Sequence, residues 1–132
     1  MTPTDQTLAT IEAFNEAFNL HDINAVLKLT TEDIVFENTS GGRFEGQEAV
    51  RAVLTRAFEL MSLGWFDTED VFAVEDRCVV LWTYTFNREK PEGSQVRGLD
   101  VFRVRDRRVA EKYSSVKSEE FVQKLGLRIP HA

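Results

Sequence analysis

Apolar residues recur every three or four positions in two stretches of the chain, and this period is typical of helices with one buried face. The stretch Thr7–Asn19 predicts a first helix, whose apolar positions are Leu8, Ile11, Phe14, Ala17 and Phe18. The stretch Glu48–Leu63 predicts the longest helix, ended by Gly64, with apolar positions Val50, Val53, Leu54, Ala57, Phe58 and Met61. Between them, Asp22 is a typical N-cap for a short helix that buries Ile23, Val26 and Leu27.

The rest of the chain is rich in alternating, β-branched and aromatic positions, which indicates strands. We expect one strand at Ile34–Asn38, ended by Ser40-Gly41-Gly42, and an antiparallel meander further on. The strands of the meander are predicted at Asp70–Val74, Cys78–Asn87, Gln95–Val104 and Val109–Val116, and a last short helix at Ser118–Leu125. This order predicts an α+β fold with helices on one face of a curved sheet. The cone-shaped cavity at the open end of such a sheet is the expected site.

Composition limits the classes of function. The chain has 132 residues, which predicts one domain, and 16 basic against 22 acidic residues give it a net charge of −6. This charge argues against a nucleic-acid or anionic-membrane partner. There is no apolar run of membrane-spanning length and no signal-peptide pattern at the N-terminus. The single cysteine, Cys78, fits a buried strand position in a reducing compartment, so we expect a cytoplasmic protein.

Five segments carry a resemblance to a known superfamily: Phe14–Asp22, Glu32–Asn38, Phe44–Val50, Leu99–Val104 and Arg108–Tyr113. In their order and spacing the chain resembles the nuclear transport factor 2-like superfamily, in particular its bacterial SnoaL-like branch. The resemblance implies a single domain over residues 1–132, with a core from about 7 to 125. It also implies a cystatin-like α+β roll, in which a curved antiparallel or mixed sheet packs against three helices. The superfamily includes ketosteroid isomerases, polyketide cyclases, dehydratases, epoxide hydrolases and members without known activity.

The catalytic pattern of the isomerases is only partly present. That pattern implies a carboxylate base on the first strand and an oxyanion hole formed by a tyrosine and a protonated aspartic acid. The matching positions here are Asn38 for the base, Phe14 for the tyrosine and Asp100 for the acid. An amide cannot abstract a proton and a phenyl ring cannot donate a hydrogen bond, so conventional ketosteroid isomerisation is not expected. Glu37 replaces the base only if the strand slips by one residue.

Two other catalytic patterns of the superfamily are also incomplete. The limonene-type epoxide hydrolases need an Arg-x-Asp on the long central strand, where this chain has Trp82-Thr83-Tyr84-Thr85-Phe86. The SnoaL-type cyclases tend to place an acid near Ser114, and this chain has none there.

Asp100 and Asn38 are the candidate catalytic residues. Asp100 is an acid on the otherwise apolar strand face of Val96, Phe102 and Val104, where desolvation favours a neutral acid that donates to a ligand carbonyl. The alternative is a structural carboxylate paired with Lys112 or with an arginine of the neighbouring strand. Asn38 either orients a ligand or ties down the end of its strand.

The other candidates are walls of an apolar pocket. Trp82 and Tyr84 share a strand face and offer an indole N–H and a hydroxyl, whereas Phe86 on the same face is read as ordinary core. The full set of candidate substrate-binding residues is Phe14, Phe18, Val53, Phe58, Trp82, Tyr84, Ser114 and Val116. Two histidines, His21 at a helix junction and His131 in the C-terminal tail, and one cysteine predict no metal site, and no nucleotide-binding glycine motif is present, so no cofactor is expected.

These features favour a pocket protein for a small, largely apolar ring compound that carries a carbonyl or a hydroxyl. If the protein is an enzyme, the chemistry is cofactor-free isomerisation, cyclisation or dehydration. The alternative is a non-catalytic ligand-binding or assembly module on the same fold. The opposite sheet face, with Val79, Leu81, Leu99 and Val101, is too apolar to face water, which predicts a homodimer through that face.

Overall fold

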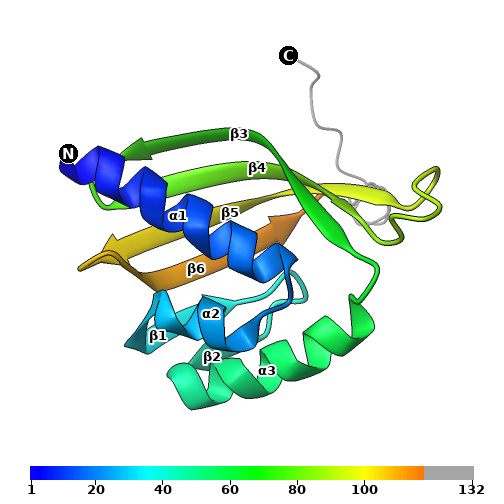
Figure 1. The fold of residues 1–132 in the computed structure, drawn as a ribbon, viewed down its shortest axis with the longest axis horizontal. Coiled ribbons are helices and arrows are strands. Elements are labelled where there is room, and N and C mark those ends of the chain that lie inside the picture. The colour runs from blue at the N-terminus through cyan, green and yellow to red at the C-terminus, as the bar shows by residue number, and fades with distance from the viewer. Residues whose placement is uncertain (118–132) are drawn as a thin grey trace, which may run out of the picture.

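The computed structural model describes residues 1–117, which form three helices and one curved, six-stranded mixed sheet (Figure 1). The helices are α1 (Pro3–Asn19), α2 (Ile23–Lys28) and α3 (Gln47–Leu60). The strands are β1 (Thr30–Glu37), β2 (Arg43–Glu45), β3 (Trp65–Val74), β4 (Arg77–Thr85), β5 (Gln95–Arg105) and β6 (Arg108–Val116). The predicted α+β class with helices on one face of a curved sheet is confirmed. The predicted helix at Ser118–Leu125 lies outside the described residues.

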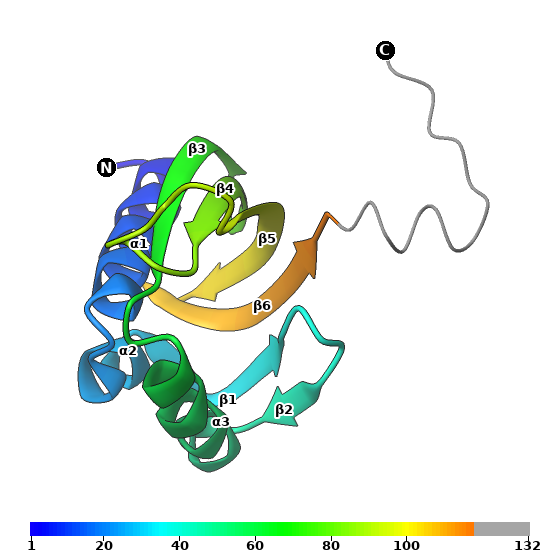
Figure 2. The same cartoon turned by 90° about the vertical axis from the view of Figure 1, so that its right-hand side faces the viewer.

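The sheet has the order β2-β1-β6-β5-β4-β3, and it is antiparallel except between β1 and β6. Figure 2 shows the sheet curving open around the side on which the helices lie. The parallel pairing joins β1 to β6, so the meander β3–β6 and the hairpin β1–β2 form one continuous open sheet. This arrangement places the inner faces of β4, β5 and β6 opposite α1.

The first helix begins four residues earlier than its apolar period predicts. Thr2 caps it, since its hydroxyl accepts a hydrogen bond from the Asp5 backbone N–H at 3.1 Å while the Asp5 carboxylate accepts from the Thr2 N–H at 3.2 Å. Pro3 at the first helical position has the backbone angle that a helix needs. With 17 residues α1 is the longest helix, not α3 with 14, so that prediction was wrong. The Asp22 cap of α2 is confirmed by its 3.1 Å contact with the Ala25 N–H.

Three strand predictions needed correction. β1 starts at Thr30 and ends at Glu37, one residue before Asn38. The chain then turns back as β2, which pairs Phe44 with Phe36 and which the sequence did not predict. β3 starts at Trp65 rather than Asp70, because the Asn19 side chain both donates to the Phe66 carbonyl and accepts from the Phe66 N–H, each at 2.9 Å.

The core lies between the helices and the inner face of the sheet. Phe14 of α1 packs edge-on against Phe102 of β5, with ring centroids 5.7 Å apart, and both are 1% exposed. Phe18 packs against Phe58 of α3 at 5.0 Å. Cys78 is buried as predicted, whereas Phe86, read as core, follows the end of β4 and is 58% exposed. None of the helices described up to residue 117 combines the length and apolarity needed to cross a membrane.

Candidate functional site

A small cavity lies between α1 and the inner face of the meander. We call it the inner cavity; its lining residues are Asn15, Phe18, Asn19, Phe66, Thr68, Val80, Trp82, Asp100 and Lys112. Its volume of about 30 Å³ is room for about two water molecules or one small polar group. The cavity therefore has room for a small polar group but not for a whole ring system.

Strand register brings the polar side chains of the inner cavity together. Asp100 of β5 pairs with Val80 of β4 on one side and with Ser114 of β6 on the other. Trp82 pairs with Gly98, and Phe102 pairs with Lys112. Trp82, Asp100 and Lys112 therefore lie diagonally across three neighbouring strands on one face.

Gly98 makes room for the indole of Trp82. A Cβ at this position would lie 2.4 Å from the Trp82 ring and 2.4 Å from the Ser115 carbonyl oxygen. No side chain larger than hydrogen fits there without displacing the ring or the backbone. The glycine thus leaves the space that the indole ring occupies.

Asp100 and Lys112 form a buried ion pair. The Lys112 Nζ is 3.7 Å from the Asp100 Oδ2, and their side chains are 8% and 9% exposed. Nζ also donates a 2.8 Å hydrogen bond to the Ser114 hydroxyl and lies 4.6 Å from the centre of the Phe36 ring. Burial lowers the pKa of Lys112 below its ordinary value, and the attraction of Asp100 offsets only part of this effect. The sequence left two alternatives for Asp100, a neutral acid that donates to a ligand and a carboxylate paired with Lys112. The structure has Asp100 next to Lys112.

Two buried polar atoms of residues that line the inner cavity have no hydrogen-bond partner among residues 1–117. They are the Asp100 Oδ1 and the Trp82 Nε1, and the two residues are 7% and 4% exposed. A buried polar atom without a partner costs about 1–3 kcal/mol. One of these atoms is an acceptor when the acid is ionised and the other is a donor, so together they complement a group that both donates and accepts, such as a hydroxyl.

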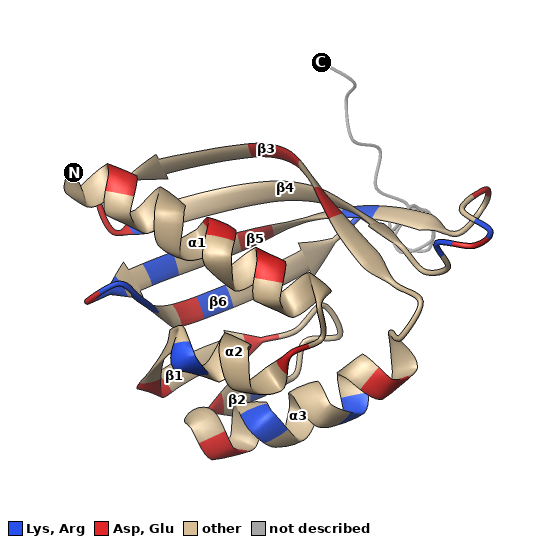
Figure 3. Ribbon diagram, in the orientation of Figure 1, with Lys and Arg blue, Asp and Glu red and all other residues tan. Residues whose placement is uncertain are grey.

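A larger groove adjoins the inner cavity between α1 and β3. The two hollows share Asn15, Asn19, Thr68 and Val80, and the groove has a volume of about 740 Å³. Apolar side chains form much of its surface: Leu8, Ile11, Leu20, Trp65 and Val71. Acidic positions recur along the exposed side of α1 (Figure 3), and two of them, Glu12 and Glu16, also line the groove. A volume of this size suits a small organic molecule.

Of the residues that the sequence singled out, Asp100, Phe18 and Trp82 line the inner cavity. Ser114 lies beside it through its hydrogen bond with Lys112. Phe14, Val53, Phe58 and Tyr84 belong to or pack against the core and are not among the residues that line either hollow. The Tyr84 hydroxyl is packed against Gly64, and burial raises its pKa.

Two candidates lie away from the inner cavity. Asn38 follows β1 in the turn to β2, where its Oδ1 accepts hydrogen bonds from the Ser40 hydroxyl at 2.7 Å and the Gly42 N–H at 2.9 Å. Asn38 therefore ties down the end of its strand rather than facing a ligand, because β1 ends at Glu37 and Asn38 belongs to the turn. Val116 is 37% exposed near the end of β6 and lines a separate hollow with Leu81 and Leu99.

From the sequence, Lys112 is predicted only as a partner of Asp100, and the polar residues of α1 are not predicted to line the site. The alternation of Ala110, Lys112 and Ser114 places this lysine on the inner face and was the signal available. Asn15 and Asn19 are four residues apart, one helical turn, on the side of α1 next to the apolar face. In the part of the chain that the structure describes, no three side chains of His, Cys, Asp or Glu converge as metal ligands.

His21 lies at the junction of α1 and α2, where the sequence predicts a solvated side chain. Its ring is 5.1 Å from that of Phe58. Burial, with a smaller contribution from the positive charge of Arg88, lowers its pKa. This side chain is not among those lining the inner cavity.

Comparison with known proteins agrees with this architecture. The family model described as the SnoaL-like domain matches residues 11–112. An NTF2-like protein of unknown function from Mesorhizobium loti is 32% identical, with a TM-score of 0.74 over 89% of this chain and 96% of that chain. A search of curated proteins gave no match.

Two more distant structures show the same fold. A candidate polyketide cyclase from Xanthomonas campestris pv. campestris is 20% identical, with a TM-score of 0.72 over 94% of this chain and 99% of that chain. A candidate ketosteroid isomerase from Kribbella flavida is 17% identical, with a TM-score of 0.73 over 99% of this chain and 95% of that chain. With the family match over most of its length, the chain belongs to the SnoaL-like family of the nuclear transport factor 2-like superfamily.

Proposed function

We propose that this protein binds a small, largely apolar compound by its hydroxyl or carbonyl group and moves a proton on it without a cofactor. The observation that carries this proposal is the pair of unpartnered atoms, Asp100 Oδ1 and Trp82 Nε1, which belong to two residues that line the same cavity. A ligand hydroxyl satisfies both at once, since it donates to the carboxylate and accepts from the indole N–H. The rings of the ligand lie in the groove between α1 and β3.

The reaction class is isomerisation, cyclisation or dehydration. Each of these needs a group that takes or gives a proton at hydrogen-bond distance from the reacting atom. Asp100 is that group, and the Trp82 N–H stabilises negative charge on the ligand oxygen. Membership of the SnoaL-like family and the fold shared with candidate cyclases and isomerases support this class.

A matched pair of ligands tests the proposal. 2-Naphthol and 2-methylnaphthalene have the same shape, but only the first has an O–H. We expect 2-naphthol to bind more tightly, and Trp82→Phe to weaken it by about 3- to 10-fold, the value of one hydrogen bond, without affecting 2-methylnaphthalene. Phe86→Leu, at an exposed position, is the control. Equal affinities of the two ligands, measured by calorimetry, would overturn the proposal.

A non-catalytic binding module is the second candidate, and two observations favour it. Asn38 is used in a turn and Phe14 is in the core, so the base and tyrosine positions of the isomerase pattern supply neither group. Native mass spectrometry of protein as purified distinguishes the two. A ligand that stays bound and chemically unchanged over hours indicates the module, whereas conversion of the ligand indicates the enzyme.

We also propose that two copies pair through the outer face of the sheet. Val79, Leu81, Leu99 and Val101 on this face are half-buried in the single chain, and Phe72 is 54% exposed. A hollow of about 260 Å³ lies on the same side, lined in part by Leu81 and Leu99. Helices cover only the inner face, so a second copy is the occupant that removes this apolar surface from water.

A further inference from the structure

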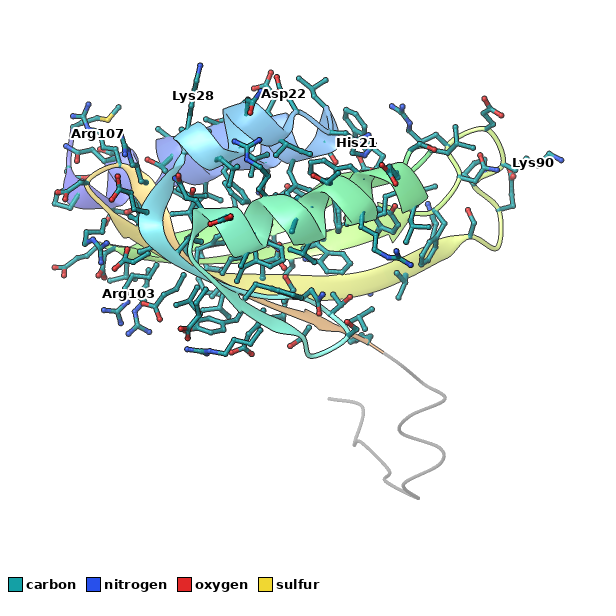
Figure 4. The ribbon with its side chains drawn as sticks, turned by 90° about the horizontal axis from the view of Figure 1, so that it is seen from below. His21, Asp22, Lys28, Lys90, Arg103 and Arg107 are labelled. Atoms are coloured by element: carbon teal, nitrogen blue, oxygen red, sulfur yellow. The ribbon has the colours of Figure 1, made fainter. Side chains whose placement is uncertain are left out.

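Lys112 differs from the other lysines of the described chain. Lys28, Lys90 and Lys117 are exposed, and Figure 4 shows the first two pointing away from the body of the molecule. Lys112 is 6% exposed and is one of the residues that line the inner cavity. A lysine in this setting is chemically unlike a surface lysine, because its amine is withdrawn from water next to a space that a ligand can enter.

The surroundings of the Lys112 Nζ satisfy an ammonium group poorly. An ammonium has three donors, and among residues 1–117 only the Ser114 hydroxyl accepts from it at hydrogen-bond distance. The Asp100 Oδ2 is 3.7 Å away, beyond that distance. Two aromatic rings also lie near the amine, with the centre of the Phe36 ring 4.6 Å and that of the Phe18 ring 5.3 Å from Nζ. Asp100 is the charged group that faces the amine, and its attraction does not repay the loss of water, so the pKa of Lys112 is lowered.

We propose that Lys112 is a nucleophilic amine, which forms a Schiff base with an aldehyde or ketone that reaches the inner cavity from the groove. Desolvation in an apolar pocket is one of the ways in which proteins activate lysine for this chemistry. The cavity has room for a carbonyl group, and the adjoining groove has room for the rest of a small organic compound. The substrate class is therefore an apolar carbonyl compound.

Asp100 is placed to carry the protons of this reaction. The reactive form of the pair has the shared proton on Asp100, so that the amine is neutral. The Lys112 lone pair forms a C–N bond to the carbonyl carbon and the C=O π pair moves to oxygen, which takes the proton of Asp100; the proton lost from nitrogen then returns to the Asp100 carboxylate. In the second step the nitrogen lone pair forms the C=N bond, and the hydroxyl leaves as water with that proton. The sum is neutral amine, carboxylic acid and carbonyl giving protonated imine, carboxylate and water, with no oxidant or reductant. The protonated imine then lies beside the Asp100 carboxylate.

This inference does not depend on the proton transfer proposed above, because Schiff-base formation needs the Lys112 lone pair whether or not the protein turns over a hydroxylated ligand. The test uses acetaldehyde, a carbonyl compound small enough for the inner cavity, followed by borohydride. Reduction of the imine leaves an ethyl group on the reacted lysine, which peptide mass spectrometry locates.

At pH 7 we expect Lys112 to be labelled faster than Lys28 and Lys90, since a lysine with a lowered pKa has more of its amine in the neutral form. The preference should shrink as pH rises toward 10, and it should vanish in urea. Lys112→Arg keeps the positive charge and should remove the fast label while Lys28 and Lys90 react as before. Labelling of Lys112 no faster than Lys28 in the folded wild-type protein would overturn the proposal, and this measurement needs no variant.

Discussion

Replacing either member of the Asp100–Lys112 pair leaves the other buried without its charge partner. Removing one partner of a buried ion pair costs about 3–5 kcal/mol in other proteins. The 3.7 Å separation, the Ser114 hydrogen bond and the two aromatic faces around Lys112 reduce the effect here. We expect Asp100→Asn and Lys112→Met each to lower the free energy of unfolding by about 2–3 kcal/mol. The double variant is uncharged at both positions, and we expect it to lose only about 1–2 kcal/mol.

A double-mutant cycle in urea measures this coupling, with far-UV circular dichroism as the signal. The two single losses then sum to more than the loss of the double variant by about 2–5 kcal/mol. A loss of 2–3 kcal/mol corresponds to a melting temperature lower by roughly 6–12 °C for a domain of this size. If the single losses add to the double loss within about 0.5 kcal/mol, Asp100 and Lys112 are not coupled and our reading of the site is wrong.

Four further predictions concern separate features. The pKa of Lys112 is lowered, so between the folded-state pKa and the ordinary value of 10.5 the unfolded chain binds more protons than the folded one. Over that pH range the free energy of unfolding of the wild type should therefore rise relative to that of Lys112→Met. No such rise would contradict the lowered pKa. Comparing the two proteins removes the opposing contribution of Cys78, whose pKa burial raises to about 11. Gly98→Ala should cost about 1–3 kcal/mol and change the fluorescence of Trp82, because its Cβ would lie 2.4 Å from the ring; an unchanged spectrum would show that the ring does not depend on Gly98. Light scattering at micromolar concentration should give a dimer, and a single species near 15.1 kDa would refute pairing through the outer face. A 5-ene-3-ketosteroid should not be isomerised at an enzyme-like rate, because Asn38 at the base position is used in a turn and Phe14 at the tyrosine position lies in the core. Turnover that is lost in Asp100→Ala but kept in Glu37→Gln would refute this and show that Asp100 alone supplies the base for this substrate.

Elements with one buried and one exposed face were predicted from the sequence, because their apolar residues recur with a clear period. Elements without such a period were missed. The helices at α1 and α3 and the strands β4–β6 have a strong period because each buries one face. β2 has only three residues, which is too short for alternation to register. The first half of β3 is an edge segment held by Asn19, a side chain 46 residues before Trp65, so no local pattern marks it.

A site residue could be predicted where the pattern of its own strand identifies it. Contacts between strands could not be predicted, because they depend on the pairing register. Asp100 stands out as an acid among apolar residues of its own strand. Whether it meets Lys112 depends on how β5 pairs with β6, which includes a shift of register between Arg103 and Val104. Asn38 was misplaced because β1 already ends at Glu37 and the turn that follows uses the Asn38 amide.

The polar groups of the inner cavity are arranged differently from the isomerase pattern that the sequence resembles. That pattern takes its base from the first strand and a donor from the first helix, whereas Trp82, Asp100 and Lys112 all come from adjacent strands of the meander. Backbone hydrogen bonds between those strands hold the three side chains in fixed relative positions, which favours a preorganised site. A proton that moves between Lys112 and Asp100 leaves the net charge of the cavity unchanged, so either protonation state of the pair can face an uncharged ligand. This explains how a buried acid and a buried amine coexist beside an apolar groove, and it makes a neutral carbonyl or hydroxyl compound a better match than a charged one.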